Sequence, residues 1–189
     1  WPENGMSNIT NYAIRNKSAK PMVIVMPDGL DAFYCNNYNG GNLLYEDFLI
    51  EEFFPYIEST YKIKAERGGR AIAGLSMGGY GATFHAFKRP EMFSSCYSMS
   101  GALAMGTSAP DLQEIINSLS PEQLANLPAF TMEVGTEDYL VYSSNVSFDA
   151  FLEGKGIEHT YITRAGSHDW AFWMACLPKV LTFVSNNFE

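Results

Sequence analysis

The chain has 189 residues, of which 47% are hydrophobic and 14% aromatic, and this is enough to bury one large core. The formal net charge is -9 and Lys and Arg form no basic stripe, so the composition argues against a nucleic acid partner. No apolar run approaches the ~20 residues that a membrane-spanning helix needs. With three widely spaced cysteines and three histidines, neither a disulfide framework nor a multi-histidine metal site is favoured.

The first predicted strand is an apolar run at 22–26, which follows Pro21 and ends at Pro27-Asp28-Gly29. A short run that is apolar at every position is typical of a strand buried on both faces of a parallel sheet. An irregular loop over 30–41 follows it, at the strand end where parallel sheets bind ligands. The polar stretch before the strand contains one helical face, formed by Ile9, Tyr12, Ala13 and Ile14.

Strand and helix patterns alternate through the rest of the chain. A long helix over about 43–61, capped by Asn42, contains Pro55, which predicts a kink or a break. Ser120-Pro121-Glu122-Gln123 provides an N-cap, a proline at the first helical position and a capping-box partner. Further strands are expected at 70–75, 95–100, 129–134 and 157–164, and further helices at 77–88, within 111–127, at 143–153 and over 173–188. The alternation predicts one α/β domain over 1–189, a mainly parallel sheet with helices on both faces.

A Gly-x-Ser-x-Gly motif, Gly74-Leu75-Ser76-Met77-Gly78, lies between the strand at 70–75 and the helix at 77–88. Strand, sharp turn and helix form the setting in which this motif becomes a nucleophile elbow. Glycines are needed because the turn strains the serine backbone and brings strand and helix close together. The motif therefore predicts Ser76 as a nucleophile.

A serine hydroxyl needs a base that takes its proton, and the base needs a carboxylate that orients it. Of the three histidines, only His168 lies in a loop at a C-terminal strand end; His85 lies inside a helix, where it is expected to pack, and His159 is expected at the surface. Asp138 follows the strand at 129–134 and gives the chain order Ser, Asp, His. Its neighbour Glu137 is the alternative acid, whereas Asp169 is expected to cap the last helix.

The oxyanion hole is expected to use the backbone N–H of Met77, the residue after the nucleophile. Gly29-Leu30 is the place in the sequence from which a second N–H donor would come if one is present. Tyr34, Tyr80 and Trp170 are the aromatic residues expected to bind substrate. Phe172 and Trp173 are further candidates for lining the same pocket, and the alternative for Trp173 is a place in the helix core. These patterns imply neither a metal nor a cofactor.

The three motifs together resemble the branch of the α/β-hydrolases that contains esterase D, tributyrin esterases, feruloyl esterases and the antigen 85 acyltransferases. The elbow stretch 71–81 looks most like the tributyrin and feruloyl esterases, Gly135 to Leu140 like the acid loop, and Gly166 to Trp170 like the histidine loop. The resemblance covers essentially the whole chain. It implies Ser76 as nucleophile, His168 as base and Asp138 as the orienting acid.

The N-terminus departs from this family. Members begin with further strands, and one of these lies between the strands expected at 22–26 and 70–75, ends in a His-Gly-type loop and supplies the second oxyanion N–H. Trp1 looks like a tryptophan that follows this loop, so the chain is expected to be truncated relative to the family. Two hypotheses follow: the chain is part of a longer protein, or the sheet closes by pairing 22–26 directly with 70–75.

The sequence therefore predicts a serine carboxylesterase that acts on small acyl or carbohydrate esters, either short-chain acyl esters or feruloyl esters. An acyltransferase of the antigen 85 type is one alternative, and a catalytically silent carbohydrate-binding or scaffold domain is the other. The sequence leaves a homo-oligomer open, and because it starts at Trp1 rather than Met it also leaves cytoplasmic and secreted localisation open.

Overall fold

A computed structural model describes residues 1–104 and 108–189, and its centre is a four-stranded sheet in the order β1-β2-β3-β4. The strands are β1 (Ala71–Leu75), β2 (Ser95–Met99), β3 (Ala129–Gly135) and β4 (Thr160–Arg164). Each neighbouring pair is parallel, with Ala71 opposite Ser95, Ser95 opposite Ala129 and Thr131 opposite Thr160. The parallel sheet is confirmed, and all four strand C-termini point to the edge that carries the predicted motifs.

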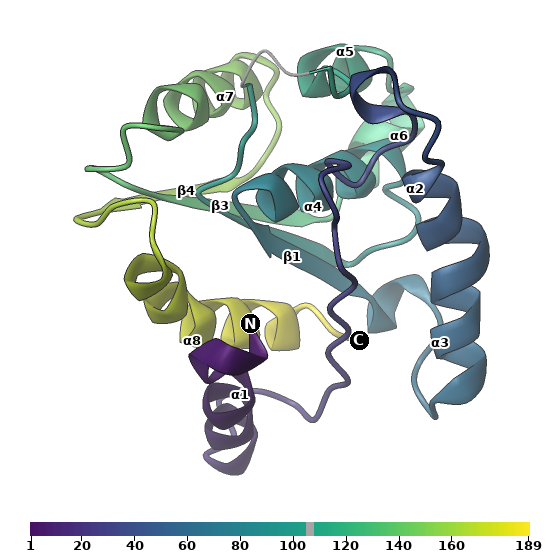
Figure 1. Cartoon of the computed structure of the whole chain (residues 1–189), viewed down its shortest axis with the longest axis vertical. Coiled ribbons are helices and arrows are strands. Elements are labelled where there is room, and N and C mark those ends of the chain that lie inside the picture. Colours follow the sequence, from purple (N-terminus) through teal and green to yellow (C-terminus); the bar gives the residue numbers. More distant parts are fainter. Residues whose placement is uncertain (105–107) are drawn as a thin grey trace.

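Helices cover both faces of the sheet, as expected (Figure 1). Helix α4 (Met77–Lys88) connects β1 to β2, and α7 (Tyr142–Gly154) connects β3 to β4 on the same side. Helix α8 (Trp170–Asn186) lies on the opposite face, with α1 (Met6–Arg15) packed against it. The shorter helices are α5 (Leu112–Asn117), α6 (Pro121–Ala125) and the 3-10 turns η1 (Pro2–Asn4), η2 (Tyr38–Gly40) and η4 (Arg67–Gly69).

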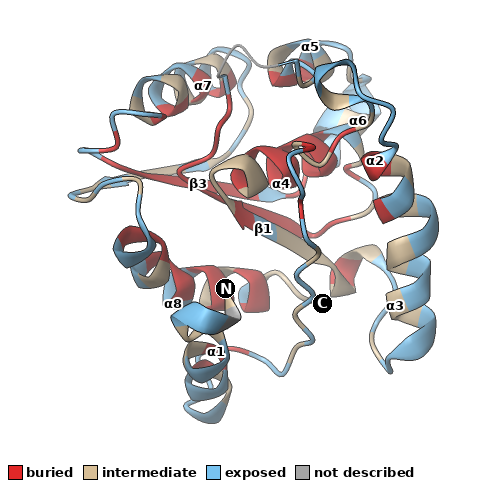
Figure 2. Ribbon diagram, viewed as in Figure 1, coloured by how far each residue is buried: buried red, intermediate tan, exposed pale blue. Residues whose placement is uncertain are grey.

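The core is densest around the middle strands (Figure 2). All five residues of β2 are buried, and β3 is buried from Phe130 to Gly135. The α4 and α7 face contributes Phe84, Phe87 and Phe148 to the main cluster, whereas Tyr97 and Met99 pack against α8 on the other face. Strand β1 differs, because its residues are only partly buried apart from Gly74, and Ala73 is exposed.

The predicted strand at 22–26 is wrong, and so is its direct pairing with β1. Residues 20–29 have no regular secondary structure and belong to no strand in the described part of the chain. Val23 is 51% exposed and Val25 is 40% exposed. The apolar run predicted burial, but a strand also needs a backbone partner, and a cavity of about 640 Å³ lies between this segment and β1.

The long helix predicted at 43–61 forms as three consecutive segments. Helix α2 (Tyr45–Asp47) continues into the π-helical η3 (Phe48–Phe53) and then α3 (Phe54–Thr60), with Pro55 in the first turn of α3. The backbone stays helical through Phe53 and Phe54, so the predicted break is absent, and Pro55 lies where the π-helical segment changes to α-helix. Proline is tolerated there because the first turn of a helical segment does not need its missing N–H. Glu46 of α2 accepts from Lys88 Nζ at 2.7 Å and also pairs with Arg89, which fastens this arm to the end of α4.

Two predicted helix caps are present. Ser120 Oγ accepts from Gln123 N at 3.2 Å and Gln123 Oε1 accepts from Ser120 N at 3.0 Å, which completes the capping box of α6. Asp169 Oδ1 accepts from Phe172 N at 2.8 Å and caps α8. The second cap matters most for the site, since it fixes where α8 begins, directly after His168.

Candidate active site

Ser76 lies at the turn between β1 and α4 with a left-handed φ of 51° and ψ of -118°. Its N–H donates to Met99 O on β2 at 2.9 Å, and its carbonyl accepts from Ala102 N at 3.0 Å. A Cβ on Gly74 would lie 2.1 Å from the carbonyl oxygen of Gly78, so only glycine fits where strand and helix meet. This turn lifts the hydroxyl of Ser76 above the sheet edge, as the motif predicts.

The structure brings together the three residues that the sequence singled out. Ser76 Oγ lies 2.8 Å from His168 Nε2, and His168 Nδ1 lies 2.7 Å from Asp138 Oδ2. The neutral imidazole that satisfies both contacts carries its proton on Nδ1, donates it to Asp138 and accepts the Ser76 hydroxyl at Nε2. This is the arrangement in which the imidazole can remove the serine proton.

Asp138 is held in place by the loop that leads into α7. Its side chain is buried, and its Oδ1 accepts from the N–H groups of Leu140 and Val141 at 3.2 Å each. These two bonds occupy one carboxylate oxygen and leave Oδ2 for the imidazole. The carboxylate is therefore oriented before His168 makes its contact.

The alternative acids make other contacts. Glu137 Oε2 accepts from Gly166 N at 2.8 Å, which ties the β3–α7 loop to the loop that carries His168. Asp169 caps α8. Neither has a described contact to the His168 ring, so Asp138 is the carboxylate that the geometry selects.

The other two histidines lie away from Ser76. His85 is buried in α4, its Nε2–H donates to Tyr34 O at 2.9 Å, and burial lowers its pKa to about 4. The predicted packing role is confirmed. The surface placement predicted for His159 is wrong, because its side chain is only 6% exposed. The ring lies between Ile157 O and Asp149 Oδ1, each at 2.8 Å, since α7 brings Asp149 over it.

The predicted oxyanion donor, Met77, is the first residue of α4. Its N–H lies at a helix N-terminus, where backbone donors have no partner within the helix and the helix dipole favours negative charge. The second donor suggested at Gly29-Leu30 is not supported at Leu30. Leu30 N–H donates to Asp28 Oδ1 at 2.9 Å, so it is engaged within its own loop.

The predicted substrate-binding aromatics fall into two groups. Tyr34 lines the cavity beside Ser76, and burial, with a contribution from Asp28, raises the pKa of its hydroxyl. Trp170 is 39% exposed at the start of α8. Tyr80 does not fit its prediction, because it is 2% exposed and donates to Pro110 O at 2.6 Å. It lies in the core because its position on α4 faces the packed side of the helix.

A row of tryptophans next to His168 was not predicted. Trp173 is edge-on to the His168 ring, with the ring centres 4.9 Å apart, and Trp170 lies edge-on to both Trp173 and Trp1. The sequence placed Trp173 in the helix core, which is correct, and placed Trp1 only by family resemblance. The spacing of apolar residues in α8 does not indicate that Trp1, at the other end of the chain, contacts Trp170.

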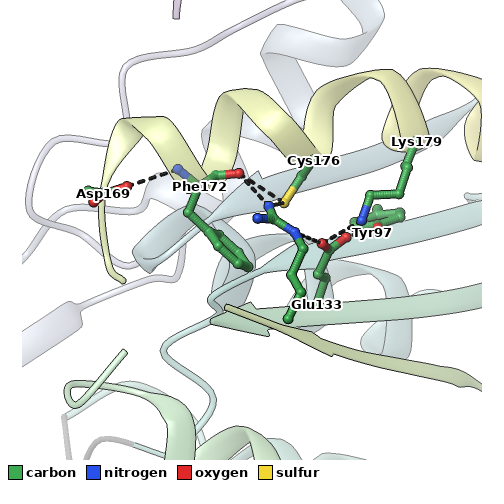
Figure 3. Close-up of polar contacts among 7 residues, drawn as sticks. Tyr97, Glu133, Asp169, Phe172, Cys176 and Lys179 are labelled. Carbon is green, nitrogen blue, oxygen red and sulfur yellow. Dashed lines mark hydrogen bonds and ion pairs between the residues drawn. The ribbon is translucent and has the colours of Figure 1, made fainter. Parts of the chain in front are cut away.

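An ionic network around the buried Glu133 joins the sheet to α8, next to the loop that carries His168 (Figure 3). Glu133 of β3 is 0% exposed and accepts from Tyr97 Oη and Lys179 Nζ, each at 2.6 Å, and from Arg164 Nε. Burial raises the pKa of Glu133, but the hydrogen bonds from Lys179, Tyr97 and Arg164 outweigh it, so the pKa lies below its usual value. Glu133 therefore stays ionised inside the sheet.

Arg164 carries this network to α8. Its Nη2 donates to Phe172 O at 2.6 Å and contacts Cys176 Sγ at 3.1 Å, and the guanidinium carbon lies 3.6 Å from the centre of the Phe172 ring. Arg164 is the last residue of β4, and the loop with His168 starts directly after it. The network thus joins β3, β4 and the first turns of α8. No sequence pattern indicates this network, because Glu133 is a single acid in an apolar strand.

Within residues 1–104 and 108–189, no group of His, Cys, Asp and Glu side chains is arranged to hold a metal ion. In the same part of the chain, no helix combines the length and the apolar character needed to cross a membrane.

The known proteins that this chain resembles are described as esterases. A family profile described as "Putative esterase" matches residues 3–184. An acetyl esterase from Caldicellulosiruptor saccharolyticus is 25% identical over 87% of this chain and 72% of its own length. An endo-1,4-beta-xylanase/feruloyl esterase from Xylanibacter ruminicola is 33% identical over 95% of this chain, which spans 23% of that longer protein.

Among solved structures, a ferulic acid esterase matches with a TM-score of 0.87 and 28% identity, over 100% of this chain and 80% of its own. A feruloyl esterase from Anaeromyces mucronatus matches with a TM-score of 0.70 at 20% identity, over 94% of this chain and 70% of its own, which concerns the fold alone. These matches confirm the α/β-hydrolase fold class.

Proposed function

The chain belongs to this esterase family, and we propose that it hydrolyses carboxylic esters through a triad of Ser76, His168 and Asp138. The observation that carries the proposal is the continuous chain of contacts from Ser76 Oγ through His168 Nε2 and Nδ1 to Asp138 Oδ2, at 2.8 and 2.7 Å. These residues come from three separate strand ends, so the arrangement is a product of the fold and not of local sequence.

In the acylation step, Ser76 Oγ attacks the ester carbonyl carbon while its proton passes to His168 Nε2. The negative charge that develops on the carbonyl oxygen is stabilised by Met77 N–H at the start of α4. His168 then returns the proton to the leaving alcohol oxygen, and an acyl group remains on Ser76. Asp138 holds the imidazole in position and stabilises its charged form.

In the deacylation step, water takes the place of the alcohol. His168 Nε2 accepts a proton from the water as its oxygen attacks the acyl carbon, and Ser76 Oγ recovers that proton when the acid leaves. Both steps use the proton shuttle at His168 and the oxyanion donor at Met77.

The substrate class we propose is an acetyl or feruloyl ester, including esters of plant polysaccharide. The similarity to an acetyl esterase and to a ferulic acid esterase supports this choice. The aromatic groups near the triad, Tyr34 and Trp170, suit a phenolic acyl group or the apolar face of a sugar. Comparing kcat/KM for an acetyl ester and a feruloyl ester would show which of the two is the better substrate.

The test is hydrolysis of p-nitrophenyl acetate and methyl ferulate by the wild type, together with labelling by a fluorophosphonate reagent and mapping of the modified peptide. We expect label on Ser76 and turnover that Ser76→Ala abolishes. Ser147→Ala is the matched control, because Ser147 is exposed on α7 and donates only to Ser143 O. Label on a different residue, or full turnover in Ser76→Ala, would overturn the proposal.

A further inference from the structure

Asn145 is a fully buried amide near the start of α7, which covers the same face of the sheet as α4 (Figure 1). Its Nδ2 donates to Val141 O and to Gly101 O, each at 2.8 Å. Carbonyl oxygens only accept hydrogen bonds, so the NH2 side of the amide must face these two groups. The bond to Val141 stays within one helical turn, whereas the bond to Gly101 crosses to the loop after β2.

The loop after β2 holds the nucleophile elbow. Ala102 N–H donates to Ser76 O at 3.0 Å, and Ser76 N–H donates to Met99 O, at the end of β2, at 2.9 Å. Gly101 also packs on the first turn of α4, because a Cβ on Gly79 would lie 2.8 Å from Gly101 Cα. This loop therefore contacts both backbone polar groups of Ser76 and supports the helix start that provides the oxyanion donor.

The other partner of Asn145 belongs to the acid loop. Val141 N–H donates to Asp138 Oδ1 at 3.2 Å, so the residue that precedes α7 helps to fix the carboxylate. The acid loop is bonded in turn to the histidine loop, where Glu137 N–H donates to Gly166 O at 3.0 Å. Asn145 thus connects the elbow to two loops that are already joined to each other.

The two carbonyls do not need Asn145 in order to be satisfied. Val141 O also accepts from Asn145 N–H at 3.0 Å, and Gly101 O also accepts from Leu103 N–H at 2.9 Å. Asn145 Oδ1 is buried and has no hydrogen-bond partner among the described residues. A buried polar atom without a partner costs free energy, so for stability alone an apolar side chain of similar size would suit this place as well. What the amide adds is the link between Gly101 and α7.

We infer that Asn145 is a positioning residue, which holds the nucleophile elbow at a fixed distance from the acid and histidine loops. Its donor contacts are to backbone carbonyls and not to reacting atoms, so it acts through Gly101 on one side and Val141 on the other. The inference deepens the proposed function and rests on it, because this distance matters to catalysis only if Ser76 is the nucleophile.

The contact that depends on this link is the one between Ser76 Oγ and His168 Nε2, at 2.8 Å. Asp138 and His168 lie in loops that are bonded to each other, so their 2.7 Å contact does not need Asn145. Loss of the amide should therefore impair proton transfer from Ser76 and leave substrate binding nearly unchanged. In kinetic terms, kcat falls and KM changes little.

The kinetic test is Asn145→Leu, which keeps a side chain of similar size and removes both donors. We expect kcat on p-nitrophenyl acetate to fall by about 10²-fold, because misplacing a reacting group by ~1 Å costs about that much. Ser144→Ala is the matched control, since Ser144 Oγ donates to the same Val141 O at 2.9 Å, and it should keep the wild-type kcat. Leu152→Ala truncates a fully buried residue of the same helix, and it should unfold more easily than Asn145→Leu and yet keep kcat.

The second test reads the two contacts of His168 by NMR without any hydrolysis. The Nδ1 proton bonded to Asp138 gives a low-field proton resonance, and the nitrogen chemical shift of Nε2 reports whether the Ser76 hydroxyl donates to it. In Asn145→Leu the low-field resonance should stay. The Nε2 shift should move toward its value in Ser76→Ala, where that donor is absent.

Asn145→Ser takes the place of Asn145→Leu if the leucine variant does not fold. The serine hydroxyl ends one atom closer to the backbone than the amide nitrogen, and in a helix it bonds the carbonyl of the preceding turn, here Val141 O. The bond to Gly101 O is lost, so the same fall in kcat and the same change in the Nε2 shift are expected.

Three results would overturn the inference. They are a wild-type kcat in Asn145→Leu, equal losses of kcat in Asn145→Leu and Leu152→Ala, and an unchanged Nε2 shift in Asn145→Leu. If the wild type hydrolyses no ester but the Nε2 shift moves as expected, the positioning role stands and the proposed function fails. If hydrolysis depends on Ser76 but Asn145→Leu matches the wild type, the function stands and the inference fails.

Discussion

Strands β3 and β1 lead into different parts of the site, and they differ in how fully they are paired and buried. Strand β3 has a neighbour on both edges, is buried from Phe130 to Gly135 and holds an ionised Glu133 with three partners. Strand β1 has a neighbour on one edge and an exposed Ala73 in its middle. The loops after β3 and β4 carry Asp138 and His168, whereas β1 carries Ser76. Asp138 and His168 thus follow strands in the half of the sheet with β3 and β4, and Ser76 follows β1, the strand at the open edge.

The three site residues can therefore be in contact even though β1 is paired on one edge only among the described residues. The contacts among Ser76, His168 and Asp138 form through loops at the C-terminal strand ends, which need only β1 to β4 in order. Catalysis also depends on how precisely the reacting groups are held, and among the described residues β1 has a paired neighbour on one edge only.

The largest expected effect concerns the orienting acid, in the half of the sheet with β3 and β4. Asp138→Asn removes the charge that fixes the His168 tautomer, and we expect kcat on p-nitrophenyl acetate to fall by about 10⁴-fold. Glu137→Gln is the matched control, because Glu137 bonds Gly166 N and not His168, and it should retain activity within a few-fold. Equal losses in the two variants would show that the carboxylate has been assigned to the wrong residue.

The second prediction compares packing in the two halves directly. Met132 of β3 is fully buried, so Met132→Ala should lower the free energy of unfolding by about 3–4 kcal/mol. Ile72 of β1 is only partly buried, and Ile72→Ala should cost about half as much. Urea unfolding of both variants measures the difference. Losses of the same size would mean that β1 is packed as tightly as β3.

The third prediction concerns the ionic link from β3 and β4 to α8. Arg164→Leu leaves the buried Glu133 with Lys179 and Tyr97 only, and it removes the donor to Phe172 O. We expect a loss of about 2–3 kcal/mol, below that of a buried charge with no partner left. Lys179→Met is the comparison: it also removes a partner of the buried Glu133, but the Lys179 side chain is 45% exposed, so solvent lies close to the site and we expect a smaller loss, about 1–2 kcal/mol. A larger loss for Lys179→Met would reverse the roles of the two cations.

The same division explains how much could be predicted from the sequence. From residue 70 onward, element type followed from local signals: the glycines around Ser76, the capping box at Ser120 and the apolar runs of β2 and β3. The grouping of Ser76, Asp138 and His168 followed from one topological rule, that parallel strands end at a common edge. The catalytic role of the three stays a prediction.

The predictions that were wrong, and the ionic network that was missed, depend on contacts between residues far apart in the sequence. The run at 22–26 has the composition of a strand, but hydrophobic pattern does not reveal whether a neighbouring strand exists. Tyr80 and His159 were assigned from position alone, and tertiary packing against Pro110 and Asp149 decided their burial. Glu133 was invisible for the same reason, since its partners lie on β2, β4 and α8.

The smallest effect concerns His85, which lines the cavity of about 640 Å³ between β1 and residues 22–27. Burial lowers its pKa to about 4, opposed by the bond to Tyr34 O and by Glu46 and reinforced by Arg89 and Lys88. Because the unfolded chain binds this proton first, at about pH 6.5, stability is lost as the pH falls from there toward 4. The share of His85 in the loss between pH 7 and pH 5 should be about 2 kcal/mol.

His85→Gln keeps a donor for Tyr34 O but does not titrate in this range. Urea unfolding at pH 7, 6 and 5 should therefore give a shallower decline for His85→Gln than for the wild type, by about 2 kcal/mol over the window. Identical slopes would mean that His85 is protonated as readily in the folded chain as in the unfolded one. Its Nδ1 would then reach water through this cavity, and the side of α4 that faces β1 would be wetter than its burial implies.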